Sequence, residues 1–352
     1  MATLAQDVIV SAERLSIFAD AVLRAVGMPD EDAAISARAM VWAELRNLPA
    51  HGVTGKLPQA ARRIRTGGTK ACVSWDPVSE SATFTVFDAR DAWGQVAAAR
   101  AMRAAIGKAT TQGLSISLVR NSSSAAAMGH YASLAATAGM IGVAITNGPP
   151  LMPAPGGTTK VVGNQGFAIG CPAGRHFPLL FDSALSLIST GEIHTAQERD
   201  EQLAPGLMLD AQGQPTVDPA AALAGLYVPI GGHRGFGIAL MWEVLAGVLS
   251  GGPRFAPDVG APDVYEKSQG VSHFLMAIDP SVSMPLAMFT ERVDVLIDQV
   301  HASPRAANVD RIYVPGERGH IISQQRERDG IPISAKREAQ LRALAQDVGV
   351  PW

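Results

Sequence analysis

The sequence is poor in cysteine and has no apolar run long enough to cross a membrane. Its two cysteines, Cys72 and Cys171, lie far apart and outside any C-x-x-C or Cys/His spacing typical of zinc sites. We therefore expect two free, buried thiols in a reducing compartment and no metal site. The apolar run from Leu134 to Ile145 is shorter than the roughly 20 residues that span a bilayer, and the N-terminus lacks the features of a signal peptide. These absences predict a cytoplasmic protein that makes no contact with a membrane.

Charge is also scarce in this chain. Only 17% of the residues are charged, the formal net charge is -3 at pH 7, and no basic stripe is present. This composition excludes the electrostatic footprint of a nucleic-acid-binding protein. With 352 residues, of which 47% are hydrophobic, the chain is long enough for a large core divided between two lobes.

Several common fingerprints are missing. The chain contains no GxGxxG, GxxxxGK[ST], HExxH or GxSxG motif. This excludes the usual forms of Rossmann nucleotide sites, P-loops, zincins and hydrolase elbows. A nicotinamide site of another kind is compatible with these absences.

What is present is a long uncharged stretch, because no Lys, Arg, Asp or Glu occurs between Arg120 and Lys160. Small residues and neutral hydrogen-bonding side chains dominate it, which suits a bed for a polar ligand that brings its own charge. The same small residues would also serve tight packing alone. Composition does not separate these two interpretations.

The hydrophobic pattern predicts a helical N-terminal segment followed by alternating strands and helices. We expect helices at 11–48 (two), 58–65, 94–113, 128–139, 238–249, 286–303 and 334–349, and strands at 82–89, 114–120, 140–147, 166–170, 178–182 and 273–280. Residues 189–219 are polar and turn-rich and predict a surface loop, and 311–320 predict a charged Pro/Gly turn. We expect Arg62, Arg63 and Arg65 on the third helix to face solvent.

Two turns carry candidate functional residues. Arg46 and His51 lie at the corner where the second helix ends, and His233 and Arg234 lie in a Gly-rich turn before an apolar helix. Functional residues are common at such corners, and a Gly-rich turn that opens a helix is a ready anion site. A lone histidine in a turn is often structural, and an arginine there can simply face water. Both interpretations stay open at this point.

Several longer segments, in this order, resemble the malate/L-lactate dehydrogenase family. The segments are AELRNLPAHGV, VRNSSSAAAMGHYASLAATAGMIGVAITN, VVGNQGFAIGCP, LFDSALSLISTGEI, GGHRGFGIALMWEVLAGVLSGG, HFLMAIDP and VPGERG. This family comprises non-Rossmann NAD(P)-dependent oxidoreductases, including sulfolactate, ureidoglycolate and diketogulonate oxidoreductases and cyclic imino-acid reductases. The resemblance implies an α/β fold with a mixed or largely antiparallel sheet in the cofactor lobe and a helical lobe formed from both chain ends. It also implies three parts: 1–119 as the N-terminal helical and α/β part of the substrate lobe, 120–280 as the cofactor-binding lobe, and 281–352 as C-terminal helices returning to the first lobe.

The resemblance further implies a reaction, namely hydride exchange between NAD or NADP and a small-molecule substrate in a homodimer. The substrate is a 2-oxo acid paired with its 2-hydroxy acid, or a cyclic imine paired with its amine. Such chemistry needs a group that moves a proton and a cation for the substrate carboxylate. By their places in the family's motifs, His51 and Arg46 are the implied catalytic residues, and Asn164 and Lys56 are the implied substrate-binding residues. The implied cofactor-binding residues are Ser124, Ala125, Ala126, Ala127, Met128, Gly148, Asp182, Ser183, Ala184, His233, Arg234, Pro315, Gly316 and Glu317.

Four positions depart from the family's pattern. Ala50 stands where the family has a serine, Gly55 where it has an arginine, and Ser124 where it has a histidine, while 163–166 read Gly-Asn-Gln-Gly in place of Gly-Thr-Asn-Pro. Because one carboxylate clamp is missing and several side chains are smaller, we expect a roomier, less cationic pocket that favours a bulkier or less acidic substrate. Two other interpretations stay open. One is a relative that binds the dinucleotide without catalysis, and the other is an enzyme that uses the inherited pocket without net redox.

Overall fold

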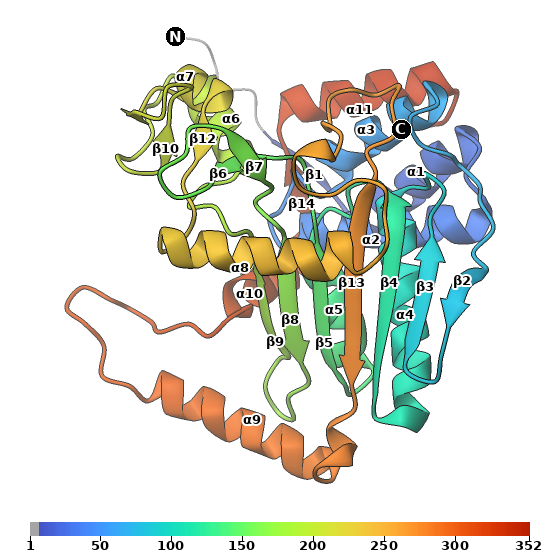
Figure 1. Ribbon diagram of the computed structural model, residues 1–352, viewed down its shortest axis with the longest axis vertical. Helices are drawn as coiled ribbons and strands as arrows, with labels where there is room; N and C mark the ends of the chain where they lie inside the picture. The colour runs from blue at the N-terminus through green and yellow to red at the C-terminus, as the bar shows by residue number, and fades with distance from the viewer. Residues whose placement is uncertain (1–6) are drawn as a thin grey trace.

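The computed structural model describes residues 7–352, and residues 1–6, where the first predicted part begins, lie outside it. Its centre is one seven-stranded sheet (Figure 1). In spatial order the strands are β2 (Pro77–Glu80), β3 (Phe84–Asp88), β4 (Leu114–Ser122), β13 (Val271–Ile278), β5 (Ile141–Thr146), β8 (Phe167–Cys171) and β9 (Leu179–Ser183). Only β3 and β4 pair in parallel, and every other neighbouring pair is antiparallel. The expected mixed, largely antiparallel sheet is therefore confirmed.

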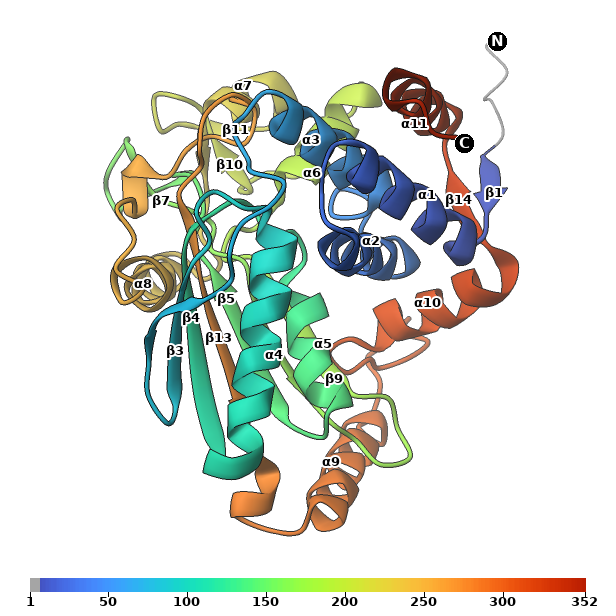
Figure 2. The ribbon, with the colours of Figure 1, turned by 90° about the vertical axis from the view of Figure 1, so that its right-hand side faces the viewer.

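Helices cover both faces of this sheet. Figure 2 shows α4 (Gly94–Gln112) and α5 (Met128–Thr137) on the face toward the helical lobe and α8 (His233–Glu243) on the opposite face. The alanines of α4 are its packing surface, since Ala98, Ala101 and Ala105 are fully buried in the core that α4, α5 and the sheet share. Such short side chains let the helix axis come close to the strands. The helix ends at Gly113, whose φ of +79° is the left-handed conformation that favours glycine at a helix end.

The helical lobe is formed from both ends of the chain, as the resemblance implied. It consists of α1 (Ala12–Ala25), α2 (Asp30–Leu45), α3 (Val53–Arg65) and α11 (Ala335–Val348), together with β1 (Val8–Val10) paired antiparallel to β14 (Ile331–Ile333). Leu15 and Leu57 from the start of the chain share one apolar core with Ile331 and Leu341 from its end. α10 (Glu317–Asp329) leads from the sheet into this lobe and lies against α2.

Smaller elements surround the upper end of the sheet and its lower end. Above it, as oriented in Figure 1, are β6 (Met152–Pro153) with β7 (Lys160–Val162), and β10 (Met208–Leu209) between β11 (Pro215–Thr216) and β12 (Leu226–Tyr227). α6 (Thr190–Glu198) and α7 (Pro219–Ala224) accompany them. At the lower end, α9 (Leu286–His301) packs through Val293 and Ile297 on the turn between β8 and β9.

The structure corrects several predictions of secondary structure. The expected loop 189–219 contains α6, β10 and β11 and the start of α7. Ser189 and Glu192 form a capping box that opens α6, and Asp218 caps α7. The charged turn 311–320 passes into α10 at Glu317, and α8 begins at His233 rather than at 238. α3 begins at Val53, so Pro58 lies inside the helix rather than at its start.

Two predictions of exposure are also wrong. Cys72 is exposed and Cys171 is only half-buried, so the free thiols are not core residues. Arg63 has no exposed surface, although it was expected on a solvated helix face with Arg62 and Arg65. No helix within residues 7–352 has the length and hydropathy of a membrane span, and no cluster of three metal-ligating side chains occurs there.

Candidate active site

One edge of the sheet collects most of the residues singled out from the sequence. Since β4 and β5 both pair antiparallel to β13, they run in the same direction, and β9 runs with them because β8 lies antiparallel between β5 and β9. The ends of β4, β5 and β9 and the starts of β8 and β13 therefore meet at the same edge. This arrangement places 124–128, Gly148, Asn164 and 182–184 at that edge.

Backbone contacts tie these segments together. The amide of Leu185 donates to the carbonyl oxygen of Asn164 at 2.7 Å, and the amide of Ser124 donates to Oε1 of Gln269 at 3.2 Å. A side chain at Gly163 would lie 2.7 Å from the carbonyl oxygen of Gly148, so these two loops touch. By contrast, a Cβ at Gly148 would meet nothing within 4 Å, so the edge is open there.

The turn that carries His233 and Arg234 joins the same edge from the other face of the sheet. The amide of Ile230 donates to the carbonyl oxygen of Leu185 at 2.9 Å, which fixes the turn beside the end of β9. His233 and Arg234 are both exposed at the start of α8, and its N-cap, Gly232, offers no capping side chain. The first amides of α8 are thus free of a side-chain cap.

A buried carboxylate supports this edge, and sequence reasoning missed it. Glu243, only 2% exposed, accepts hydrogen bonds from Nδ2 of Asn147 at 2.9 Å, from the amide of Ala256 at 2.8 Å and from Nε2 of Gln165. Gln165 has a φ of +40° and belongs to the departing Gly-Asn-Gln-Gly segment. The signal available in the sequence was a single acid inside the apolar run IALMWEVLAGVL. Such a residue needs internal partners, and here the loops of the edge provide them.

His273 was also missed as a site residue. Its Nδ1 lies 2.9 Å from Oγ1 of Thr146 and its Nε2 lies 3.0 Å from Oγ of Ser122. Complete burial lowers the pKa of His273 to about 3, so the ring is neutral and links the ends of β4 and β5. Its role is to hold the edge together.

His51 stands at the corner between α2 and α3. It is half-buried, and its Nδ1 is a buried atom without a hydrogen-bond partner. Burial, reinforced by the charge of Lys56, lowers the pKa of His51 to about 4. Burial and the nearby charge of Arg63 lower the pKa of Lys56 to about 8, and Lys56 Nζ donates to Oε1 of Gln59 at 2.9 Å. His51 is therefore neutral at pH 7 beside a lysine that still carries its proton.

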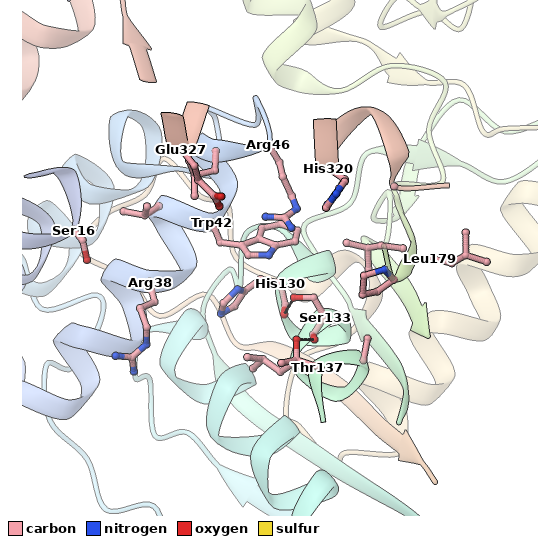
Figure 3. Close-up of a pocket in the computed structure, with 17 residues that line it drawn as sticks. Ser16, Arg38, Trp42, Arg46, His130, Ser133, Thr137, Leu179, His320 and Glu327 are labelled. Atoms are coloured by element: carbon pink, nitrogen blue, oxygen red, sulfur yellow. Dashed lines mark hydrogen bonds between the residues drawn. The ribbon is translucent and has the colours of Figure 1, made fainter. Parts of the chain in front are cut away.

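Arg46 faces a different cavity, shown in Figure 3, which has a volume of about 510 Å³ and is lined by α2, α5, α10 and the turn before β9. Its guanidinium lies 4.1 Å from the ring centre of Trp42, and that indole meets the ring of His130 edge to face at 5.6 Å. His130 is buried, its Nδ1 has no partner, and burial lowers its pKa to about 3. Gly316 lines the same cavity. The structure thus groups Arg46 with Gly316, while Lys56 lines another cavity.

Asp182 lies beside this cavity. A Cβ on Gly129 would come within 2.6 Å of Oδ2 of Asp182 and 2.9 Å of Trp42, so these side chains crowd around the start of α5. One side of Asp182 stays open to solvent, yet the surrounding protein desolvates its carboxylate. This desolvation raises the pKa of Asp182 to about 6, against the opposing effect of the Gly129 amide.

The Pro315–Glu317 segment reaches β9 from the other side. The amide of Leu180 donates to the carbonyl oxygen of Pro315 at 3.2 Å. Glu317 is fully buried, and its carboxylate accepts from the Val314 amide at 3.0 Å, from His301 at 2.9 Å and from Arg311. Although burial alone would raise the pKa of Glu317, these partners hold it below its usual value. The Glu317 side chain is therefore engaged internally, which leaves the backbone of this turn for contact with a ligand.

A second cavity, of about 430 Å³, lies between α3, α11 and the loop around Tyr265. It is lined by Ala50, Thr54, Gly55, Lys56, Pro58, Gln59, Arg62, Tyr265 and Gln340. Both departing positions of the corner, Ala50 and Gly55, thus border one space. The structure does not leave Gly55 as an empty place, because a Cβ there would lie 2.6 Å from the carbonyl oxygen of Pro49 and 2.7 Å from that of Ala50. The extra volume expected from Gly55 is occupied by backbone.

Comparisons with known proteins agree with this architecture. Residues 10–342 match the family model described as malate/L-lactate dehydrogenase. The chain is 32% identical over 351 residues to a malate dehydrogenase of Pyrococcus horikoshii, covering 97% of this chain and 96% of that one. It is also 32% identical over 329 residues to an L-sulfolactate dehydrogenase of Methanocaldococcus jannaschii, covering 94% of each chain.

Solved structures extend the similarity to three dimensions. The structure of the Pyrococcus horikoshii malate dehydrogenase aligns with a TM-score of 0.90 over 98% of this chain and 97% of that one, at 32% identity. A Δ1-piperideine-2-carboxylate reductase of Pseudomonas syringae aligns with a TM-score of 0.86 at 26% identity, over 96% of this chain and 100% of that chain.

Proposed function

Since this chain belongs to the malate/L-lactate dehydrogenase family, we propose that it transfers a hydride between NADH or NADPH and a 2-oxo acid, forming the 2-hydroxy acid. The family is enzymatic and the named relatives are dehydrogenases, so the chain is an oxidoreductase that uses a nicotinamide cofactor. A cyclic imine and its amine are the second substrate pair, supported by the structural likeness to the piperideine-carboxylate reductase.

The observation that carries this proposal is the shared edge of the sheet. Four separate loops, at 124–128, 148, 164 and 182–184, meet there with small side chains and with open space at Gly148. These residues fit a flat, extended dinucleotide, because short side chains let the backbone approach a ring and free amides at the start of α8 suit its phosphates. The nicotinamide would supply the hydride, and the protein would orient it.

His51 is the proposed group that moves the proton. Its imidazole is neutral at pH 7, so it accepts the proton of a hydroxy acid when that acid is oxidised. The buried Nδ1 without a partner marks one ring nitrogen as free for a ligand. The charge of Lys56 beside it favours the neutral ring and attracts a carboxylate.

Calorimetry and steady-state kinetics together test this function. We expect NADH or NADPH to bind with measurable heat and to be oxidised by members of a panel of 2-oxo acids and cyclic imines. No heat and no thermal shift with either cofactor at millimolar concentration would overturn the proposal. Cofactor binding without any oxidation would favour the non-redox use of the pocket, which product analysis would then identify.

We also propose that the enzyme is a cytoplasmic homodimer. The outward face of α8 and the turn that follows it is apolar, with Met241, Val248 and Leu249 each about half exposed at 52%, 49% and 50%. Contiguous apolar surface of this kind is typical of a protein interface. Light scattering coupled to gel filtration would measure the mass, and a single species near the monomer mass of 36.8 kDa would contradict the dimer.

A further inference from the structure

The cavity between α3, α11 and the loop around Tyr265, which we call the α3 cleft, is surrounded by cations that lack anionic partners. Lys56 and Arg62 line it directly. Lys56 Nζ donates to the neutral amide of Gln59, and the Arg62 guanidinium lies 4.0 Å from the ring centre of Tyr265. Neither contact neutralises a charge.

Two more cations stand behind these. Arg63 is fully buried, and its guanidinium donates to backbone carbonyl oxygens, including that of Val264 at 2.9 Å. Arg337 of α11 donates to Oγ1 of Thr54 at 3.2 Å. None of the ion pairs formed within residues 7–352 includes Lys56, Arg62, Arg63 or Arg337.

The acids near the α3 cleft do not compensate this charge. Glu44 is buried behind Thr54 and already accepts two hydrogen bonds from it. Glu266 acts on Arg63 only at longer range. The lowered pKa of Lys56 is consistent with an ammonium that has no carboxylate beside it, because a close anion would raise it.

We infer that the α3 cleft binds an acidic group of the substrate, so that the enzyme acts on substrates with a second carboxylate placed away from the reacting carbon. Lys56 links the two places, since it lines the cleft and its charge reaches His51. A carboxylate held by Lys56 and Arg62 gains charge-assisted hydrogen bonds from both. This inference rests on the proposed dehydrogenase function for the identity of the ligand as a substrate.

The inference also reverses one expectation from the sequence. Counting only Arg46 and Lys56 near His51 predicted a less cationic pocket. The fold adds Arg62 and Arg63 from the next turns of α3 and Arg337 from α11, which packs on α3. With the family's arginine position closed by backbone at Gly55, these side chains present the positive charge from another direction.

Binding without cofactor tests the cleft independently of turnover. Tricarballylate, which has three carboxylates and no oxo group, is titrated into the whole protein by calorimetry, with acetate as the single-carboxylate comparison. We expect tricarballylate to bind and Lys56→Met and Arg62→Met each to weaken it by on the order of 10-fold, while Lys56→Arg stays within about threefold. Arg65→Met is the matched control, because Arg65 lies on the same helix but pairs with Asp347 outside the cleft.

Three results would overturn the inference: tricarballylate binding no better than acetate, Arg65→Met weakening it as much as Lys56→Met, or Lys56→Met leaving it unchanged. Kinetics then distinguish failure of the cleft from failure of the proposed function. We expect kcat/KM for 2-oxoglutarate to exceed that for pyruvate, and Lys56→Met to reduce the ratio by on the order of 10-fold. Turnover of pyruvate with no preference for the diacid would preserve the dehydrogenase function and contradict the cleft.

Discussion

The carboxylate of Glu44 on α2 accepts two hydrogen bonds from Thr54 on α3, at 2.8 Å from its amide and 2.7 Å from its hydroxyl. Gly52, the N-cap of α3, has no side chain to cap the helix, so Glu44 supplies the cap from another helix. The Glu44 backbone carbonyl in turn accepts from Arg326 of α10. The corner that carries His51 is therefore anchored by three helices.

Gly52→Ala should loosen this corner. A Cβ at Gly52 would lie 2.5 Å from Cγ of Glu44, so the capping carboxylate has to move. We expect the free energy of unfolding to fall by about 1–3 kcal/mol, measured by urea denaturation, with a loss of kcat from the displaced His51. Gly107→Ala is the control. A Cβ at this exposed position of α4 meets nothing within 4 Å, so that variant should gain up to about 1 kcal/mol. Equal stability of both variants would contradict the role of Glu44.

Restoring the family's arginine at Gly55 should fail. The carbonyl oxygens of Pro49 and Ala50 occupy the place of a Cβ, so Gly55→Arg is expected to cost about 2 kcal/mol or more without improving carboxylate binding. Ala50→Ser, which restores the neighbouring serine at an exposed position, should stay within about 0.5 kcal/mol of the parent. Thermal denaturation of both variants checks this. A stable Gly55→Arg protein with a lower KM would show that the 49–50 backbone yields readily.

His51→Asn should separate chemistry from binding. We expect turnover to fall by on the order of 100-fold or more while cofactor affinity stays nearly unchanged. Because the pKa of His51 is about 4, the parent's rate of hydroxy-acid oxidation should rise with pH up to about 5 and level off above it. Steady-state rates over pH 3.5–9 measure both effects, and a variant as active as the parent would move the proton-transfer role to another residue.

Two buried histidines should make the fold sensitive to acid. His130 and His273 have folded pKa values of about 3, below the value of 6.5 expected for the unfolded chain. The unfolded state therefore binds more protons between these values. Each residue then removes up to about 1.4 kcal/mol of stability per pH unit as the pH falls below 6.5. His130→Phe, which suits the aromatic contacts with Trp42 and Tyr131, should reduce the slope of melting temperature against pH between 4 and 6.

Asp182 acts in the opposite direction. Its folded pKa is raised to about 6, so its contribution favours the folded state at low pH and is lost as the pH rises through about 6. Asp182→Asn should therefore raise the melting temperature at pH 8 more than at pH 5. An effect of the opposite sign would show that the Asp182 carboxylate is better stabilised in the folded state than its surroundings suggest.

Local patterns predicted much of the fold. The apolar spacing of α1 and α2, the alanines of α4 and the alternation in β3 each reflect forces within a few residues, and the structure confirms those elements. Errors arose where a partner distant in sequence supplied the missing interaction. α3 begins before Pro58 because Glu44 caps it from α2, and the end of α2 is held by Arg326 from α10. The capping box at Ser189 was readable in the sequence but was outweighed by the polarity of the surrounding residues.

The site was less predictable because its residues come together through packing. The buried Glu243 joins loops that lie 78 and 96 residues away in sequence, which no local pattern encodes. The α3 cleft gains Arg337 only because α11 returns to α3 at the end of the chain. The roles assigned to Arg46, His51, Asn164 and the cofactor-binding residues stay predictions that the experiments above address.

The pairing of β1 with β14 has a consequence for the order in which the protein is made. All seven strands of the sheet, from Pro77 to Ile278, leave the ribosome before β14 is synthesised. Meanwhile Leu15 and Leu57 wait for Ile331 and Leu341 to cover them. We therefore expect the sheet to form first and the helical lobe to close last. A chain released before Ile331 would retain its sheet but expose this apolar surface, which makes it a target for chaperones and proteases.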